Sequence, residues 1–227
     1  MKGPDLDEIE QKLPLPQPGA PLPALLPEDI LTLGAGTAMG RIFCRGGPYP
    51  TGWDAFRSFG PTGSRFDPHL ADASGAPCEG SRGVMYLAYR GRRDALTTCL
   101  AEFFQRAEMI DRRGKDPWFA SFDLARPVRL LDLHGLWTSR AGISTAIASG
   151  PKYRSQHWAR EIYAQYPDLD GIAYPSSMAG HGEAVALFER ATDALPANPE
   201  FHRALADPVL HAAITRSAEL LGKGLDG

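Results

Sequence analysis

The order of strand-like and helix-like segments is the feature that most constrains the fold of this chain. Apolar runs of strand length occur at residues 40–43, 84–89, 118–124, 128–133 and 169–174. Helical periodicity and capping residues predict helices over residues 94–112, 152–166 and 207–221. Residues 184–188 are too few for periodicity to decide between strand and helix. Because the segments do not follow a strict strand–helix–strand repeat, the chain is predicted to adopt an α+β fold.

The first 37 residues differ in composition from the rest of the chain. Six prolines between residues 14 and 27 exclude a continuous helix or a central strand there. We interpret residues 1–37 as a Pro-rich N-terminal arm, either laid over the domain or mobile, and the sequence leaves both readings open. Residues 38–227 are predicted to form a single domain with a C-terminal helix, which suits a chain of 227 residues.

A long segment rich in Gly, Pro and Ser follows the first predicted strand of this domain. Residues 46–83 show no periodic pattern and are therefore predicted to be irregular. Irregular segments of this length are uncommon inside a compact domain and tend to be functional.

Charge and cysteine content exclude several classes of protein. A formal net charge of −3 argues against a general nucleic-acid binder, which needs clustered cations to neutralise phosphates. The three cysteines are widely spaced and form no CxxC pair, which argues against a disulfide framework and against a zinc site. No apolar segment follows the start, and no run approaches the ~18 apolar residues that cross a bilayer. We therefore expect a cytoplasmic protein with no membrane partner.

The phrase Gly-Ser-Arg-Phe-Asp-Pro at residues 63–68 contains the first candidate site residue, Arg65. Small residues before an arginine let the backbone approach a ligand closely. The guanidinium offers a planar fork of donors that suits a phosphate or a carboxylate. Taken alone, however, an arginine in a loop is more often solvated or paired at the surface.

Glu102 and Tyr86 are the next candidates. On a helical wheel Glu102 lies beside the apolar stripe of residues 94–112, where its carboxylate can face a cleft and stabilise a cation. The alternative is a surface ion pair with Arg106 at i,i+4, and the wheel alone favours it. Tyr86 lies in the predicted strand 84–89 and, taken alone, is better explained as a core residue with a hydrogen-bonded hydroxyl.

Ser176 lies just beyond the predicted strand 169–174, a place where sheets often present ligand contacts. There is no GxSxG elbow, so a hydrolase nucleophile is not indicated. There is also no P-loop and no GxGxxG motif, which argues against kinases, GTPases and Rossmann dehydrogenases. The histidines have no spacing that indicates a metal site, and no metal cofactor is expected.

Taken in order along the chain, these phrases resemble the RES domain family, which is named for its arginine, glutamate and serine. The matching phrases are Gly-Arg-Ile-Phe at 40–43, Ser-Arg-Phe-Asp-Pro at 64–68, Val-Met-Tyr-Leu-Ala at 84–88, Leu-Ala-Glu at 100–102 and Asp-Gly-Ile-Ala-Tyr-Pro-Ser at 170–176. Each phrase is loose, but their order and spacing together are specific. The resemblance covers about residues 35–190 and leaves the Pro-rich start and the last helix unexplained.

The resemblance implies an ADP-ribosyltransferase-like core, which is a split, bent β-sheet with flanking helices and NAD+ bound in its cleft. Known RES proteins are toxins of toxin–antitoxin pairs. They either degrade NAD+ by hydrolysis or phosphorolysis or transfer ADP-ribose to a protein of nucleotide metabolism. We therefore expect NAD+ as the substrate, with ADP-ribose passed to water or phosphate. A protein acceptor is the alternative, and a non-catalytic binding module is less favoured. A cognate antitoxin that blocks the active site is the expected partner.

The resemblance also implies a role for each candidate. Breaking the bond between nicotinamide and ribose generates an oxocarbenium-like cation. Glu102 is expected to stabilise that charge and to hydrogen-bond a ribose hydroxyl. Arg65 is expected to clamp the diphosphate or the ribose, with Arg41 as a second cationic contact.

Two further roles follow from the same resemblance. Tyr86 is expected to stack on or cover the nicotinamide. Ser176 is expected to hydrogen-bond the ribose or the amide, with Ser177 as the alternative. The segment between Arg65 and Tyr86 is interpreted as a lid, an acceptor-binding surface or an antitoxin contact, and the sequence does not rank these.

Overall fold

The fold is organised around one large sheet in the computed structural model, which describes residues 6–17, 19–89, 91 and 94–226. The strand order in this sheet is β1-β7-β8-β9-β4-β2-β6-β10, with β3 paired to β4, and only β7 and β8 among the described pairs of this sheet run parallel. The strands are β1 Ile30–Leu33, β2 Ala38–Cys44, β3 Arg57–Gly60, β4 Cys78–Tyr89, β6 Pro117–Asp123, β7 Val128–Asp132, β8 Gly171–Pro175, β9 Glu183–Phe188 and β10 Phe201–Ala204.

The sheet is split between β2 and β4. β4 pairs with β9 from Val84 to Tyr89, and β2 pairs with β6 along its whole length. In the described residues, β2 and β4 pair with each other only at Met39 with Tyr89 and at Gly40 with Ala88. Beyond these residues the two strands diverge and leave room between the halves of the sheet. The predicted split in the sheet is therefore confirmed.

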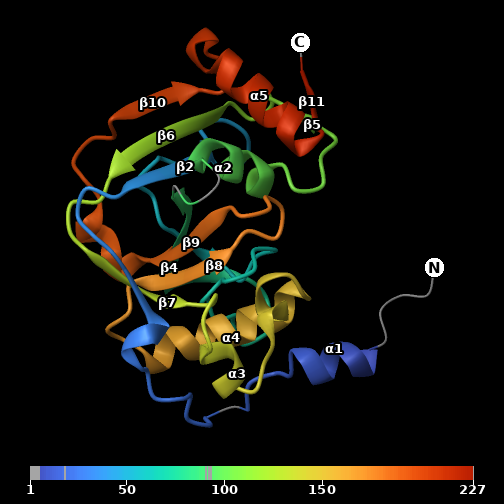
Figure 1. The fold of residues 1–227 in the computed structure, drawn as a ribbon, viewed down its shortest axis with the longest axis vertical. Coiled ribbons are helices and arrows are strands. Elements are labelled where there is room, and N and C mark those ends of the chain that lie inside the picture. The colour runs from blue at the N-terminus through green and yellow to red at the C-terminus, as the bar shows by residue number, and fades with distance from the viewer. Residues whose placement is uncertain (1–5, 18, 90, 92–93, 227) are drawn as a thin grey trace.

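Helices cover the two halves of the sheet separately. Figure 1 shows α2 and α5 beside β2, β6 and β10, and α3 and α4 beside β7 and β8. The helices are α1 Leu6–Lys12, α2 Ala95–Phe103, α3 Trp137–Arg140, α4 Lys152–Gln165 and α5 His211–Leu221, with short 3-10 turns η1 Pro27–Asp29, η2 Thr145–Ala148, η3 Glu189–Ala194 and η4 Pro208–Leu210. A small parallel pair joins β5 Met109–Ile110 to β11 Gly224–Leu225. Within the described ranges, no helix has the length and apolar character needed to cross a membrane.

Helix α2 begins where the sequence predicts but ends earlier. The Asp94 side chain caps it by accepting a hydrogen bond from the backbone N–H of Thr97 at 2.8 Å. The helix was predicted to run to residue 112 but ends at Phe103, so that prediction is wrong at its C-terminal end. Lys223 Nζ donates to the carbonyl oxygen of Phe104 at 2.9 Å, and β5 pairs with β11 directly afterwards. These distant contacts end the helix, and local periodicity does not contain them.

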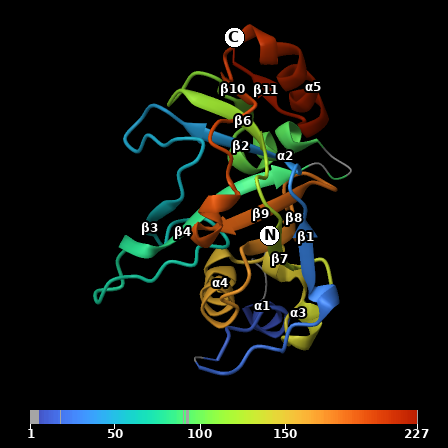
Figure 2. The same cartoon turned by 90° about the vertical axis from the view of Figure 1, so that its left-hand side faces the viewer.

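The segment 46–83 contains more regular structure than predicted. β3 pairs with the first residues of β4, which begins at Cys78 and not at residue 84. The start of β4 is mostly exposed and lacks alternating apolar residues, so its pairing with β3 is what makes it a strand. Figure 2 shows β3, the start of β4 and the chain between them reaching out from the body of the molecule. The predictions of strands at 40–43, 118–124, 128–133 and 169–174 and of helices at 152–166 and 207–221 are confirmed within a few residues, and the strand predicted at 84–89 is the second half of β4.

The arm before the domain packs against α4. Leu13 is fully buried in a core cluster that also contains Trp158 and Ile162 of α4. Trp158 Nε1 donates to the carbonyl oxygen of Pro14 at 2.8 Å, and Arg154 Nη1 donates to that of Leu13 at 2.9 Å. The arm thus lies on the helix that begins at Lys152. The boundary between residues 37 and 38 stays a prediction, and residues 1–5 and 18 of the predicted arm lie outside the described residues.

Replacing Leu13 by alanine is expected to lower the free energy of unfolding by about 2 kcal/mol, because it leaves a cavity in a closed core. The measurement is the urea midpoint at an unchanged m-value. Leu15 is the matched control, since it lies two residues away with 43% of its surface exposed. Leu15→Ala is expected to change stability by no more than about 0.5 kcal/mol. Equal losses for both variants would contradict the packing described for the arm.

Candidate active site

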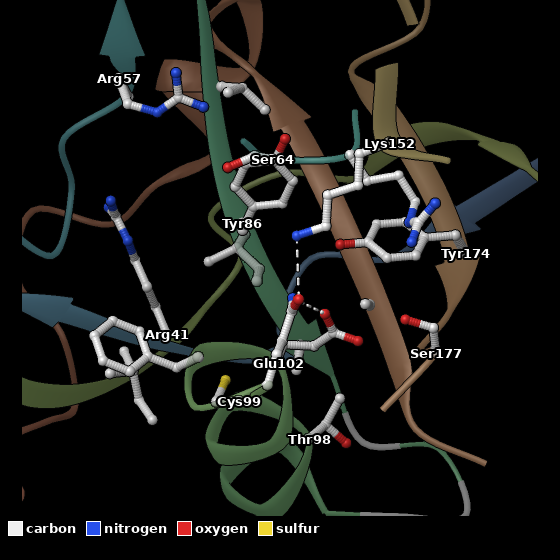
Figure 3. A pocket seen from close by; sticks show the side chains of 18 of the residues that line it. Arg41, Arg57, Ser64, Tyr86, Thr98, Cys99, Glu102, Lys152, Tyr174 and Ser177 are labelled. Carbon is white, nitrogen blue, oxygen red and sulfur yellow. Dashed lines mark hydrogen bonds between the residues drawn. The ribbon is translucent and has the colours of Figure 1, made fainter. Parts of the chain in front are cut away.

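A cavity of about 320 Å³ lies where β2 and β4 diverge. This volume falls at the lower end of the range of small-molecule sites. Its walls come from β2, β4 and α2, with contributions from the 63–68 phrase, the start of α4 and the end of β8. Figure 3 shows side chains from these elements pointing into one space. Four of the predicted site residues line it, namely Arg41, Arg65, Tyr86 and Glu102.

Glu102 projects into the cavity from the last turn of α2. Gly40 of β2 lets this helix approach the sheet, since a Cβ there would lie 3.0 Å from Ala95 Cβ. Glu102 Oε1 accepts a hydrogen bond from Ser176 Oγ at 2.5 Å, and Oε2 accepts one from Gln105 Nε2 at 3.1 Å. Because α2 ends at Phe103, Arg106 is not on a following helical turn, and no ion pair between it and Glu102 is found among the described residues. The carboxylate is thus held at both oxygens beside the cavity.

The two serines after β8 occupy different positions. Ser177 lines the cavity, whereas Ser176 points its hydroxyl at Glu102. Ser176 Oγ also accepts hydrogen bonds from the backbone N–H groups of Met178 at 3.2 Å and Ala179 at 2.9 Å. With its lone pairs engaged in this way, the hydroxyl directs its proton to Glu102. The predicted contact of Ser176 with a ribose or an amide stays a prediction.

Tyr86 lines the cavity from β4, and its hydroxyl has a fixed partner. The hydroxyl donates to Asp67 Oδ1 at 2.9 Å, and Asp67 is fully buried. Burial raises the pKa of Tyr86 well above its ordinary value, and the nearby Asp67 carboxylate adds to this effect. Tyr86 therefore stays neutral and presents an aromatic face whose position is set through its hydroxyl.

Asp67 organises this side of the cavity. It forms an ion pair with Arg57 of β3 and accepts hydrogen bonds at Oδ2 from the backbone N–H of Thr62 at 2.7 Å and from Thr62 Oγ1 at 2.9 Å. Neither Asp67 nor Arg57 was given a role from sequence, although Asp67 belongs to the Ser-Arg-Phe-Asp-Pro phrase. A carboxylate between the apolar residues Phe66 and Pro68 is the signal in the sequence that could have identified it.

The two predicted arginines reach the cavity from different elements. Arg65 Nη1 donates to the carbonyl oxygen of Gly150 at 2.5 Å, just before α4. Arg41 is 8% exposed, and its Nη1 donates to the carbonyl oxygen of Trp53 at 2.7 Å. Burial lowers the pKa of Arg41 to about 10, so it remains a cation at neutral pH. Both guanidiniums keep further N–H groups beyond these backbone contacts.

Gln105, Lys152 and Tyr174 are among the lining residues that were not identified from sequence. Lys152 is the first residue of α4, and its Nζ donates to Gln105 Oε1 at 3.1 Å. Tyr174 is buried, and its ring centroid lies 4.5 Å from that of Phe66. Figure 3 shows Lys152 pointing toward Glu102, with dashed lines for the hydrogen bonds from Lys152 to Gln105 and from Gln105 to Glu102. A second, more open hollow adjoins the cavity and shares Glu102, Gln105 and Lys152 with it.

The arrangement combines one anchored carboxylate with arginine cations and aromatic rings. A cavity of this kind suits an anionic, partly aromatic ligand, with the carboxylate placed to stabilise positive charge that develops during a reaction. In the part of the chain that the structure describes, no group of three or more His, Cys, Asp or Glu side chains is arranged to hold a metal ion.

Comparison with known proteins gives one family match and one structural likeness. The family model described as the RES domain matches residues 39–208. A chain of the M. tuberculosis MbcT–MbcA toxin–antitoxin complex is similar in structure, with a TM-score of 0.51 and 15% sequence identity over 82% of this chain and 92% of that chain. No curated protein matches the sequence. The prediction of an α+β fold with an ADP-ribosyltransferase-like split sheet and flanking helices is confirmed.

Proposed function

The chain belongs to the RES domain family, and on this premise we propose that it is an enzyme that cleaves the nicotinamide–ribose bond of NAD+ and transfers ADP-ribose to water or phosphate. We further propose that it acts as the toxin of a toxin–antitoxin pair. The observation that carries the proposal is the anchored carboxylate of Glu102, which faces a cavity that also holds Arg65, Arg41 and Tyr86.

The proposed reaction follows from the chemistry of the bond. The bond between the ribose C1′ and the pyridinium nitrogen breaks, and its electron pair leaves with nicotinamide, which becomes neutral. The ribose carbon becomes an oxocarbenium-like cation, and the nearby anionic carboxylate of Glu102 lowers its energy. An oxygen of water or phosphate then bonds to that carbon, and in the case of water a proton is released to solvent.

The other lining residues support binding and orientation in this proposal. Arg65 and Arg41 clamp the diphosphate or a ribose through the N–H groups that the protein leaves available. Tyr86 covers the nicotinamide with a ring whose hydroxyl is held by Asp67. Ser176 acts on Glu102 and Ser177 faces the ligand, which is why we assign the two serines different roles.

The biological role is proposed from the structural likeness. The similar chain comes from a complex that is described as a toxin–antitoxin complex. An enzyme that consumed NAD+ without restraint would kill its own cell, so we propose a cognate antitoxin that blocks the cavity. Co-expression of this chain with the product of the adjacent reading frame is the direct test, and restored growth is the expected result.

Incubation of the purified protein with NAD+ labelled in its adenylate half tests the activity. Free labelled ADP-ribose is expected in plain buffer, or its 1″-phosphate in phosphate buffer, together with released nicotinamide. Label that appears only on a protein after lysate is added would instead favour an ADP-ribosyltransferase, which acts on a protein such as one of nucleotide metabolism. Intact NAD+ under all three conditions would refute the proposal and favour a non-catalytic binding module.

The two serines provide a separate prediction. Ser176→Ala is expected to lower kcat about tenfold with little change in KM, because it removes one of the hydrogen bonds that hold Glu102. Ser177→Ala is expected to raise KM with a smaller change in kcat, because this serine lines the cavity. Steady-state kinetics of both variants provide the measurement, and the reverse pattern would contradict the assignment.

A further inference from the structure

Gln105 and Lys152 form a hydrogen-bonded series that ends on Glu102. Gln105 Nε2 donates to Glu102 Oε2 at 3.1 Å, and Lys152 Nζ donates to Gln105 Oε1 at 3.1 Å. Gln105 lies just beyond α2, whereas Lys152 begins α4, so the series joins the two halves of the molecule across the cavity. Figure 3 shows the lysine reaching across to the glutamate side of the cavity.

The chemistry of the two groups fixes the direction of the series. An ammonium group has three donors and no acceptor, so only the carbonyl end of the Gln105 amide can face Lys152. The NH₂ end must then face Glu102, where it donates to the carboxylate. Without Lys152 the amide could rotate, and its oxygen would meet the oxygen of Glu102. Lys152 therefore determines that Gln105 is a donor to Glu102.

The same logic applies to the other oxygen of Glu102. The Ser176 hydroxyl can only donate to Glu102 Oε1, because two backbone N–H groups already donate to its lone pairs. Each carboxylate oxygen thus receives a donor whose orientation a third group sets. Both donors hold the Glu102 carboxylate in one position.

We propose that Gln105 and Lys152 are positioning residues that fix the Glu102 carboxylate for the reaction, an inference that rests on the proposed function. Lys152 acts through Gln105 in this arrangement and not as a ligand-binding cation. A misplacement of a catalytic group by about 1 Å can cost on the order of 100-fold in rate. The loss of either positioning residue should therefore lower kcat and leave KM almost unchanged.

The test uses Gln105→Met and Lys152→Met, which retain side-chain length and remove the polar ends. Each single variant is expected to lower kcat by about 10-fold to 100-fold with KM within about twofold of the parent. The double variant is expected to be no slower than Gln105→Met alone, because Lys152 has no effect once Gln105 is gone. Losses that multiply in the double variant, or a rise in KM for Lys152→Met, would overturn the proposal. Thermal unfolding of each variant verifies that it is folded.

Arg106→Gln is the matched control, since it removes a positive charge from an exposed side chain next to Gln105. Its kcat is expected to equal that of the parent. A loss as large as that of Lys152→Met would mean that nearby positive charge, and not the series, supports Glu102.

A second readout separates this proposal from the proposed function. Crystal structures of the parent and of Gln105→Met are compared for the position of the Glu102 side chain. The parent is expected to show one conformer and the variant two or more. If the parent leaves NAD+ intact, the proposed function fails and this comparison alone decides the positioning role. A single unchanged Glu102 conformer in the variant would then refute it.

Discussion

Glu102→Ala is expected to lower the rate of NAD+ consumption by about 100- to 1,000-fold and to leave the fold intact. The loss is large because the carboxylate is the anionic group that both neighbouring hydrogen bonds hold beside the cavity. The fold should survive because Glu102 is only half-buried and lies in the last turn of α2. The measurement is the release of nicotinamide under single-turnover conditions, with thermal unfolding as the test of folding.

Replacing Glu102 by glutamine distinguishes the effect of the negative charge from the effect of side-chain shape. Glu102→Gln keeps the size of the side chain and removes the negative charge, so we expect a loss close to that of the alanine variant. Glu108→Gln is the matched control, since it removes the charge of an exposed glutamate six residues further along. Its rate is expected to equal that of the parent. A folded Glu102→Ala protein that consumed NAD+ at the parent rate would show that the assignment is wrong.

The elements that the sequence predicted best are those whose pattern is local. The strand at 128–133 and the helix at 152–166 carry their signal in their own residues, and the structure has both. The capping role of Asp94 could also be predicted from the sequence, because Asp94 and Thr97, whose backbone N–H donates to it, are only three residues apart. The end of α2 was not visible, since Lys223, far along the chain, engages the carbonyl of Phe104.

In the site, too, local sequence patterns were predictable and contacts between distant residues were not. The order of the short phrases predicted a shared site for Arg65, Tyr86 and Glu102, and all three line one cavity. The hydrogen bonds that hold these side chains were not predicted, because they join residues distant in sequence. Gln105 and Lys152 belong to no recognised phrase, and only their geometry identifies them.

Asp67→Ala is expected to lower the free energy of unfolding by roughly 3 to 5 kcal/mol, the cost of breaking a buried ion pair by removing one partner. Asp67 is fully buried, and its loss would remove an acceptor from Arg57, from Thr62 and from the hydroxyl of Tyr86. The Arg57 side chain is 27% exposed, so water can solvate part of it after the substitution. We therefore expect a loss of stability at the lower end of this range. The urea midpoint at a constant m-value provides the measurement.

Asp72→Ala is the matched control for this prediction. Asp72 lies in the same segment between β3 and β4, but it is exposed and its hydrogen bonds stay within its own turn, to Ser74 and Ala76. A much smaller loss of stability is therefore expected. Equal losses for Asp67→Ala and Asp72→Ala would contradict the organising role of Asp67.

Asp67→Asn is expected to be nearly as destabilising as the alanine variant, although asparagine has almost the same shape. Arg57 and Tyr86 donate to Oδ1, and the backbone and side chain of Thr62 donate to Oδ2. An asparagine has one acceptor oxygen, so in either orientation its NH₂ group must face donors. Only a carboxylate can accept hydrogen bonds from the donors at both Oδ1 and Oδ2. The position of Tyr86 in the cavity therefore depends on an anion at residue 67. Recovery of the parent stability by asparagine would show that one acceptor oxygen is enough and that Tyr86 does not depend on the charge.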